Sequence, residues 1–271
     1  MGKELLGSIE LNRIYQMDCL EGMRLLPDES VDLIIADPPY NRNVTKWDVF
    51  ELNEYIDFIS KCAVEFKRIL KKDGSLFIYN QQPYASFMFI EVYKHFKFVD
   101  EIIWYYKNGG SSGNRLKNAH QLLYWFSVSE SYKKNLDDVR QPYSGTRAIY
   151  KHNVDRNPAK KWTPNEKGAL PTNVWEISIV RQTERTPLTK LGIQKPLAIC
   201  EKIIKLASDV NDTALIPFVG SGSECVAAAR LNRNFIGFER EPEYVRIANQ
   251  RLENIYDEIA ERKLTEGNEN N

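Results

Sequence analysis

The tetrapeptide Asp37-Pro38-Pro39-Tyr40 combines three chemical groups on a stiff stretch of backbone. Asp37 supplies a carboxylate, Tyr40 supplies an aromatic ring, and the prolines lack N–H groups, which leaves nearby carbonyl oxygens free to accept. Acceptors for an amino group beside a ring that stacks on a base would form a pocket for a flipped-out nucleobase. An Asp-Pro-Pro sequence without further context is also typical of a proline-fixed surface turn. Its position in the fold therefore distinguishes a base-binding pocket from a surface turn.

A second candidate site is Phe218-Val219-Gly220-Ser221-Gly222. Two glycines let the backbone pass close to a ligand, and the start of the following helix offers free N–H groups. Glu239 comes 19 residues after Gly220, at the end of the next predicted strand, where a carboxylate can accept both hydroxyls of a ribose. Cys225 replaces the third glycine of the dinucleotide fingerprint, which favours a smaller nucleoside-containing ligand. A purely structural turn remains the alternative.

The elements that must position these residues alternate along the chain. Residues 30–37 form a short apolar run with β-branched side chains, stopped by Pro38, which predicts a buried parallel strand. Further strands are predicted at 75–80, 99–106, 120–128, 212–218 and 234–239, and helices at 52–74, 194–208, 221–232 and 242–263. This alternation predicts an α/β fold with a doubly wound, mostly parallel sheet, which binds ligands at the carboxyl ends of its strands. Both candidate sites follow predicted strands.

Composition excludes several other classes of protein. The 271 residues are 42% hydrophobic and 27% charged, as expected for a soluble globular chain. No apolar run approaches the ~20 residues of a membrane helix, and the charged start is unlike a signal peptide. The four cysteines are scattered and stand apart from the histidines, so we expect neither a disulfide framework nor a metal site. A cytoplasmic protein without a membrane partner is predicted.

The charge distribution is more informative than the net charge of zero, which argues weakly against nucleic acid. Ser131–Lys195 contains 13 basic and 6 acidic residues, whereas Glu241–Asn271 contains 4 basic and 8 acidic ones. Regular periodicity also fades from 129 to 185, a stretch too long for an ordinary connection. This basic middle is compatible with a phosphate-binding face, and equally with a solvated loop region.

Taken together, these motifs resemble those of the S-adenosylmethionine-dependent DNA amino-methyltransferases. Asp37–Tyr40 resembles their catalytic DPPY motif, and Phe218–Gly222 resembles their FxGxG cofactor motif. DPPY first, then an irregular region, then FxGxG resembles the order of the β group, in which the fold is circularly permuted. The likeness extends over nearly the whole chain. Gln194-Lys195-Pro196 resembles the motif that leads into the methionine-binding part of the site, and residues 168–177 resemble the return from the target-recognition region.

The resemblance implies a Rossmann-like methyltransferase fold, circularly permuted, with an irregular target-recognition insertion. Residues 1–128 would form its catalytic half, 129–185 the target-recognition region, and 186–263 the cofactor-binding half. Residues 264–271 are predicted to be a disordered tail. The family resemblance also implies a double-stranded DNA substrate, and a cognate restriction endonuclease and a homodimer as further partners.

The same resemblance implies roles for individual residues. Asp37 and the Pro38 carbonyl would hold the amino hydrogens of a flipped-out base, with Pro39 and Tyr40 completing the catalytic motif. The motif leans toward adenine N6, with cytosine N4 as the alternative. The residues implied to bind S-adenosylmethionine are Asp18, Cys19, Asp37, Lys195, Phe218, Gly220, Ser221, Gly222, Ser223, Glu239 and Arg240. The basic residues that we predict to contact DNA phosphates are Lys133, Lys134, Arg140, Arg147, Lys160 and Lys161.

Three positions depart from the family pattern. Ile216 stands where an acidic residue usually precedes Pro-Phe, Met17 where a glycine usually precedes Asp18, and Gln121 where a glutamate commonly follows His120. The loss of an acidic group at Ile216 keeps open a catalytically silent DNA-binding subunit. A nucleotide-dependent oxidoreductase is the other alternative, and the missing third glycine disfavours it.

Overall fold

The computed structural model describes residues 4–41, 49–110, 113–114, 116–144, 164–191 and 194–269. Within this part of the chain, eight strands form one central sheet, and a hairpin of β1 (Leu5–Leu6) and β2 (Ile9–Glu10) precedes it. In their order across the sheet, the eight strands are β3 (Arg13–Gln16), β10 (Asn234–Glu239), β9 (Thr213–Ile216), β4 (Val31–Ala36), β5 (Leu70–Asn80), β7 (Asn118–Ser127), β6 (Lys97–Gly110) and β8 (Val174–Glu176).

The sheet is mostly parallel, as predicted. Adjacent strands are parallel from β3 to β5 in the order β3-β10-β9-β4-β5. Strand β7 is antiparallel to both β5 and β6, and β8 is parallel to β6. The parallel strands therefore end at one side of the sheet. We call this side the carboxyl edge (residues 17–18, 37–41, 217–222 and 239–241) and the opposite side, where Asp32 and Asp212 lie, the amino edge.

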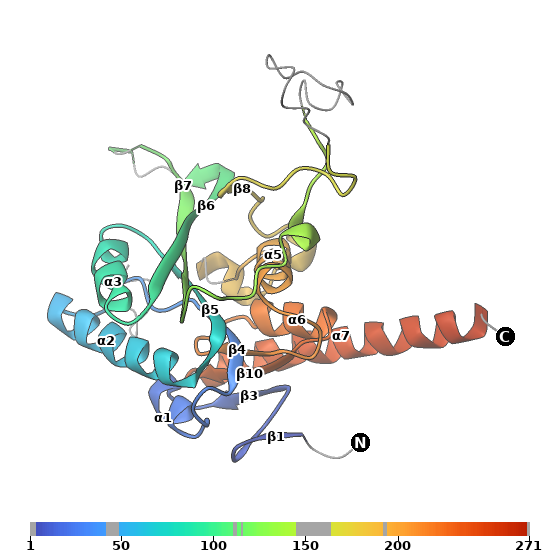
Figure 1. Ribbon diagram of the computed structural model, residues 1–271, viewed down its shortest axis with the longest axis horizontal. Helices are drawn as coiled ribbons and strands as arrows, with labels where there is room; N and C mark the ends of the chain where they lie inside the picture. Colours follow the sequence, from blue (N-terminus) through green and yellow to red (C-terminus); the bar gives the residue numbers. More distant parts are fainter. Residues whose placement is uncertain are drawn as a thin grey trace.

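Two layers of helices cover the sheet (Figure 1). One layer contains α1 (Cys19–Arg24), α2 (Leu52–Ile69) and α3 (Tyr84–Tyr93), and the other contains α5 (Leu197–Ala207), α6 (Ser223–Arg230) and α7 (Pro242–Glu269). Strand β4 is buried along its whole length and serves both layers. Its residues Ile34 and Ala36 pack in the core with α1–α3, whereas Leu33 and Ile35 pack in the core with α5–α7. This explains why its sequence is continuously apolar.

The connectivity matches the predicted permutation. Along the chain, β9, α6 and β10 come long after β4 and β5, yet β9 pairs directly with β4 through Leu33 opposite Ala214 and Ile34 opposite Leu215. Two segments far apart in the sequence are thereby neighbours in the sheet. The result is a doubly wound α/β fold in which β4 and β5 precede β9 and β10 along the chain.

Residues 129–185 do form an irregular segment where the structure describes them. The 3₁₀ turn η1 (Leu136–Val139) follows β7 and lies at the amino edge, where the Asn135 N–H donates to the Leu206 carbonyl over 2.7 Å. Paired backbone bonds of 2.9 and 2.8 Å then join Gln141 to Ala169. The segment returns to the sheet as β8, so its two described ends lie against the core.

The C-terminal prediction needs a correction. Helix α7 continues to Glu269, whereas we predicted a disordered tail from residue 264. Glutamate, leucine and lysine are good helix formers, so the helix extends beyond its last buried positions. No helix within the described residues has the length and apolarity to span a membrane.

Candidate active site

The carboxyl edge brings together the two predicted motifs and both predicted acidic ligands. Asp37 follows β4, Phe218–Gly222 follows β9, Glu239 ends β10 and Asp18 follows β3. These four strands are parallel neighbours in the order β3-β10-β9-β4. Residues as far apart in the sequence as Asp18 and Glu239 therefore share one edge, which is the ligand-binding side of such sheets.

The carboxylate of Asp37 is held by two donors. Tyr40 donates its hydroxyl to Oδ1, and Lys195 donates from Nζ to Oδ2. The Lys195 side chain is 3% exposed and that of Asp37 is 18% exposed, so the ion pair is almost entirely removed from solvent on the lysine side. The Lys195 ammonium also lies 4.9 Å from the ring centroid of Tyr79 and 5.5 Å from that of Tyr40. A buried ammonium needs such compensation.

The position of Tyr40 adds a contact that the sequence did not predict. We expected only its ring to matter, but its hydroxyl is bonded to Asp37. Burial, and then the neighbouring Asp37 carboxylate, raise the pKa of Tyr40 well above its usual value. The hydroxyl therefore remains a donor at all physiological pH values.

The structure brings together two residues that the family resemblance places at the cofactor. The Lys195 ammonium contacts Asp37. Its backbone carbonyl accepts the Ser223 hydroxyl over 2.8 Å, which ties it to the first turn of α6. Lys195 thus connects the glycine turn to the Asp37–Tyr40 motif.

The glycine turn has the backbone geometry that its sequence suggested. Gly220 has a φ of 51° and Gly222 a φ of 80°, both in the left-handed region where L-residues with side chains are disfavoured. At Gly222 an added Cβ would also lie 2.7 Å from the Cβ of Ala248 in α7. Glycine is thus required there both by conformation and by the close approach of α7.

Glu239 closes this turn from the neighbouring strand. Its Oε2 accepts the Gly220 N–H over 2.8 Å, and its Oε1 accepts the Glu241 N–H over 2.9 Å. Burial raises the pKa of Glu239, although these backbone donors oppose the shift. Each carboxylate oxygen still has lone-pair capacity for a further donor.

Asp18 and its neighbours occupy the same edge. Asp18 caps α1 by accepting the Leu20 N–H over 2.9 Å, and the exposed Arg240 guanidinium lies 4.0 Å from its carboxylate. Cys19 is 4% exposed, and its side chain packs in the core with α2 rather than at the edge. The prediction that Cys19 binds the cofactor can therefore concern only its backbone.

Three more of the predicted residues are partly occupied by structural contacts. The Phe218 ring packs edge-on against Phe58 of α2, with a centroid distance of 6.0 Å. Ser221 and Ser223 are 2% and 0% exposed. Their hydroxyls lie within reach of one another and of α7, so their side chains shape the turn from within.

Arg251, which the sequence did not single out, organises this turn. From α7, its Nη1 donates to the Ser221 carbonyl over 2.6 Å, to the Ser221 hydroxyl over 3.2 Å and to the Ser223 hydroxyl over 3.0 Å. Charge-assisted hydrogen bonds of this kind are strong and directional. In the sequence, Arg251 is one of several charges on an amphipathic helix, and no local signal distinguishes it.

Glu224 is a second residue that the sequence analysis missed. It is 4% exposed in the first turn of α6, and its Oε1 has no hydrogen-bond partner among the described residues. Burial, and then the nearby Asp37 carboxylate, raise its pKa to about 7. A glutamate in the first turn of a helix usually indicates a solvated acidic group that favours the helix start, which is why its burial was not foreseen.

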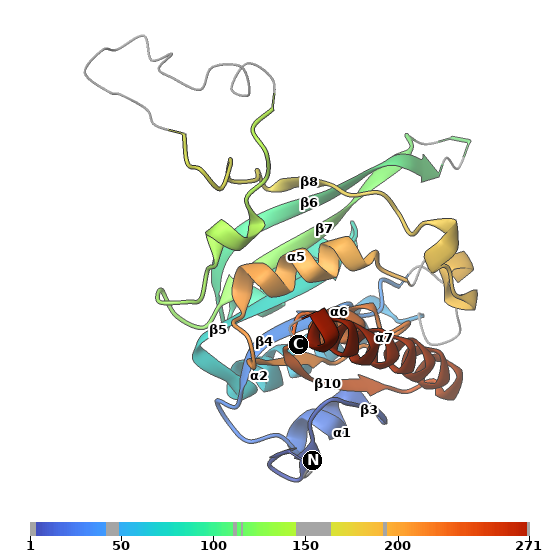
Figure 2. The same ribbon diagram turned by 90° about the vertical axis from the view of Figure 1, so that its right-hand side faces the viewer.

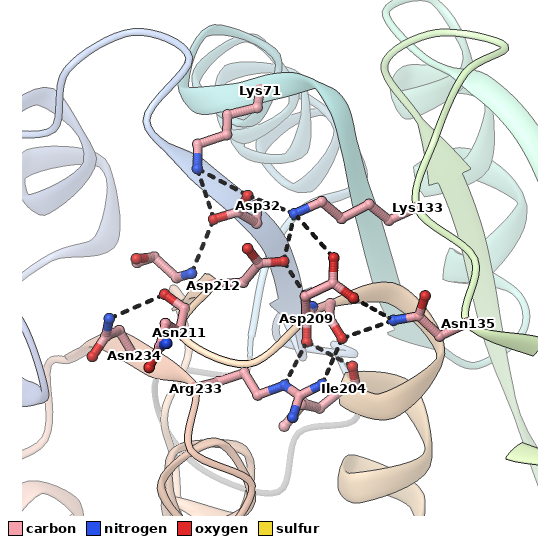
Figure 3. A network of polar contacts seen from close by, with 12 residues as sticks. Asp32, Lys71, Lys133, Asn135, Ile204, Asp209, Asn211, Asp212, Arg233 and Asn234 are labelled. Atoms are coloured by element: carbon pink, nitrogen blue, oxygen red, sulfur yellow. Dashed lines mark hydrogen bonds and ion pairs between the residues drawn. The ribbon is translucent and has the colours of Figure 1, made fainter. Parts of the chain in front are cut away.

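Two of the basic residues predicted to contact phosphates, Lys133 and Arg140, have partners within the protein. Lys133 lies at the amino edge, where its ammonium is 2.6 Å from Asp212 and 3.1 Å from Asp32 (Figure 3). Arg140 is bonded to Asp137 over 2.7 Å and to the Gly168 carbonyl over 2.7 Å. These two cations therefore stabilise the fold, on the side of the sheet away from Asp37.

The other four basic residues predicted to contact DNA phosphates are Lys134, Arg147, Lys160 and Lys161. The Lys134 ammonium lies 5.2 Å from the ring centroid of Tyr132. Arg147, Lys160 and Lys161 lie outside the described residues. The prediction for these four residues therefore stays a prediction.

Comparison with known proteins agrees with this arrangement. A family model described as DNA methylase, for N6/N4 methyltransferases, matches residues 31–250 and so spans both motifs. The chain is 35% identical over 252 residues to the type II methyltransferase M1.MboII of Moraxella bovis, covering 89% of this chain and 96% of that protein. It is 30% identical over 255 residues to the DNA adenine methyltransferase YhdJ of Escherichia coli (strain K12), covering 90% and 83% respectively.

The fold also has close counterparts among solved structures. The PvuII DNA methyltransferase (cytosine-N4-specific) superposes with a TM-score of 0.66 at 21% identity, covering 90% of this chain and 89% of that one. At this identity the likeness concerns the fold. With the family match over most of the chain, the conclusion is that this protein belongs to the N6/N4 DNA methylase family of S-adenosylmethionine-dependent methyltransferases.

Proposed function

We propose that this protein methylates N6 of adenine in double-stranded DNA and that Asp37–Tyr40 is its catalytic centre. The observation that carries the proposal is the position of the Asp37 carboxylate, at the end of β4 and on the same edge as the glycine turn and Glu239. Bound S-adenosylmethionine supplies an electrophilic methyl group. The residues of this chain have to bring an amino nitrogen to that group and raise its reactivity.

The residues of the carboxyl edge fit this cofactor. Glu239 can accept ribose hydroxyls with its remaining lone pairs, and the partly exposed Asp18 carboxylate lies on the adjacent strand end. The left-handed glycines Gly220 and Gly222 let the backbone approach a ligand without Cβ interference. We propose that these four residues hold the nucleoside part, and that Arg251 keeps the turn in the shape they need.

Asp37 would act on the base by accepting a hydrogen bond from its amino group. An exocyclic amine is a poor nucleophile because its lone pair is delocalised into the ring. A fixed carboxylate favours the state in which positive charge builds on nitrogen, as other preorganised acceptors do. Lys195 and Tyr40 fix the carboxylate, and its two oxygens offer more acceptor sites than these two donors use. The base can thus add to this arrangement.

Adenine is preferred to cytosine for two reasons. An aspartate at the first position of the motif resembles the adenine-specific members of the family, and one relative at 30% identity is named a DNA adenine methyltransferase. The cytosine-N4 enzyme among the solved structures shares the fold but only 21% of its residues, so it weighs less. Cytosine N4 remains the alternative product.

The silent-subunit alternative loses its main support. Ile216 is 0% exposed and packs in the core with α5–α7, so it is part of the sheet interior. The carboxyl edge retains the carboxylates of Asp18, Asp37 and Glu239 without it. We therefore propose an active enzyme, of the type II class to which its relatives belong, with a cognate restriction endonuclease as a partner in the cell.

Nucleoside analysis tests this function directly. Duplex DNA would be incubated with the purified protein and labelled S-adenosylmethionine, digested to nucleosides and separated by mass. We expect N6-methyladenine. N4-methylcytosine would sink the adenine assignment but keep the catalytic centre, whereas tight DNA binding without any methylated nucleoside would establish the silent subunit.

A further inference from the structure

A basic surface patch lies beside the candidate active site, at the end of the irregular segment. The patch is formed by the exposed Arg181 and Arg185 and borders a surface depression of about 350 Å³. Neither guanidinium has a hydrogen-bond or ion-pair partner among the described residues, unlike Lys133 and Arg140. The residues that line the depression are Tyr106, Lys107, Ser178, Ile179, Val180, Arg181 and Arg185.

Hydrogen bonds of Gln194 connect the patch to the residues that contact Asp37. The Gln194 amide donates to the Glu184 carbonyl over 2.5 Å, and its Oε1 accepts the Thr186 N–H over 2.9 Å. Arg185 is the residue between these two anchored positions. Gln194 is 6% exposed, and the next residue is Lys195, whose ammonium contacts Asp37. Arg185 is therefore held at a defined place relative to the catalytic motif.

The figures agree with this placement. The segment that carries η2 (Gln182–Glu184) and η3 (Pro187–Leu191) lies on the side toward which β3 and β10 point, while η1 lies toward the opposite side (Figure 2). The irregular segment thus begins at the amino edge and ends at the carboxyl edge. The last described part of the segment is the part connected to Asp37, through Gln194 and Lys195.

The charge of the patch favours an anion. Lys107 is neutralised by Glu176 over 2.6 Å, so it adds little. Between Arg181 and Arg185 in the sequence, the one acidic residue is Glu184, which is exposed. A planar guanidinium donates two parallel hydrogen bonds to the oxygens of a phosphodiester, which an ammonium does not.

We propose that Arg181 and Arg185 bind backbone phosphates of the DNA strand next to the flipped-out target base. This inference rests on the proposed DNA substrate and moves the phosphate contacts from residues 133–161 to the end of the irregular segment. Such contacts position the duplex and carry no sequence information. They would hold the strand while the base occupies the pocket at Asp37.

The test is the salt dependence of DNA binding. Fluorescence anisotropy with a labelled DNA duplex would compare the wild type with Arg181→Gln/Arg185→Gln between ~50 and ~200 mM salt. The matched control is Lys134→Gln/Lys167→Gln, which removes two exposed charges near the start of the irregular segment: Lys134 precedes η1, and Lys167 pairs with Asp137 of η1 over 3.2 Å. We expect the patch variant to lower the slope of log K against log salt by about 2, and the control to leave it unchanged.

A charge-conserving variant separates charge from structure. Arg181→Lys/Arg185→Lys should keep the salt slope, since each lysine still neutralises a phosphate, while it loses affinity through the missing second hydrogen bond. Circular dichroism melts would establish that all variants are folded. In methylation assays, the glutamine variant should lower kcat/KM more than kcat at saturating DNA.

Three outcomes would overturn the inference, and they differ in what else they affect. If the patch variant kept the wild-type affinity and salt slope while the wild type methylated the same duplex, only the phosphate assignment would fall. If the wild type bound no duplex and methylated none, the proposed substrate would fall with it. A slope reduced by the Lys134/Lys167 variant instead would locate the DNA at the start of the segment.

Discussion

Strand β4 carries one aspartate at each of its ends, and the two are held in different ways. Asp32, at the amino edge, has a 4% exposed side chain that accepts from Lys71 over 2.8 Å, from Lys133 over 3.1 Å and from the Thr213 N–H over 3.0 Å. Asp37, at the carboxyl edge, is 18% exposed and accepts from Lys195 and Tyr40. One carboxylate is enclosed by donors from three segments, whereas the other keeps room for a ligand.

Ion pairs at the amino edge hold several elements of the fold together. Asp32, Lys71, Lys133, Asp209 and Asp212 connect β4, β5, β9 and the start of the irregular segment (Figure 3). Burial by itself would raise the pKa of Asp32, but hydrogen bonds from Lys71, the Thr213 N–H and Lys133 lower it below its usual value. This contribution to stability is present above the ordinary aspartate pKa and is lost as pH falls below it.

A buried aspartate paired with a lysine does not by itself identify an active site. Both ends of β4 have one. What differs is the surrounding geometry. The carboxyl edge adds a glycine turn, a second carboxylate at Glu239 and the exposed Arg181 and Arg185, which have no partner among the described residues, whereas the charges of the amino edge contact one another. The following experiments test this difference.

The largest effect is expected at the structural aspartate. Asp32→Ala leaves Lys71 and Lys133 without their shared partner and should cost about 3–5 kcal/mol of unfolding free energy, the usual penalty for breaking a buried ion pair. Urea denaturation monitored by circular dichroism measures it. A loss below about 1 kcal/mol would show that the cluster is a surface ion pair of little consequence.

Asp37→Ala should lower the catalytic rate, in contrast to the loss of stability expected for Asp32→Ala. We expect the rate of methyl transfer to fall by at least ~10²-fold, the scale of losing one preorganised electrostatic contact. Cofactor affinity should change much less, because Glu239 and the glycine turn are untouched. Single-turnover assays at saturating DNA and cofactor measure the rate, and calorimetry measures the affinity. A folded variant with near wild-type rate would falsify the proposed catalytic centre.

Two substitutions of Tyr40 separate the contribution of its ring from that of its hydroxyl. Tyr40→Ala should lose roughly 1–3 kcal/mol of base binding by removing a stacking surface. Tyr40→Phe removes one donor to Asp37 while Lys195 remains, so a loss of about 1 kcal/mol is expected. Binding of a duplex with an abasic target position would show whether stacking is involved. Equal damage from both substitutions would assign the effect to the hydroxyl that fixes Asp37.

The last test concerns the buried Glu224, whose effect is on the pH dependence of stability. Its pKa is about 7 in the folded protein, above the usual 4.5, so the folded state binds more protons between these values. Unfolding free energy should therefore decrease as pH rises from the usual glutamate pKa to about 7, by on the order of 3 kcal/mol. Glu224→Gln should abolish this decrease in urea titrations at several pH values. An unchanged pH profile in the variant would place the titrating group elsewhere.

Much of the fold could be predicted from the sequence because its signals are local. Buried parallel strands are continuously apolar, as in residues 31–36, and amphipathic helices such as α2 repeat their buried positions every three or four residues. The predicted motifs follow strand ends, and parallel strands bring their carboxyl ends to one edge. Asp37, the glycine turn and Glu239 were therefore expected together, and they are together.

The remaining features depend on contacts between distant parts of the chain. Lys195 meets Asp37 across 158 positions, and Lys133 meets Asp32 across 101, and no periodicity encodes either pairing. Both lysines belong to one basic stretch, yet the tertiary structure sends them to opposite edges of the sheet. The sequence determined which residues could do chemistry and the strand ends that would carry them. The packing of the chain decided which charges neutralise one another and which remain available, because charge pairing depends on separations of a few ångströms that only tertiary structure sets.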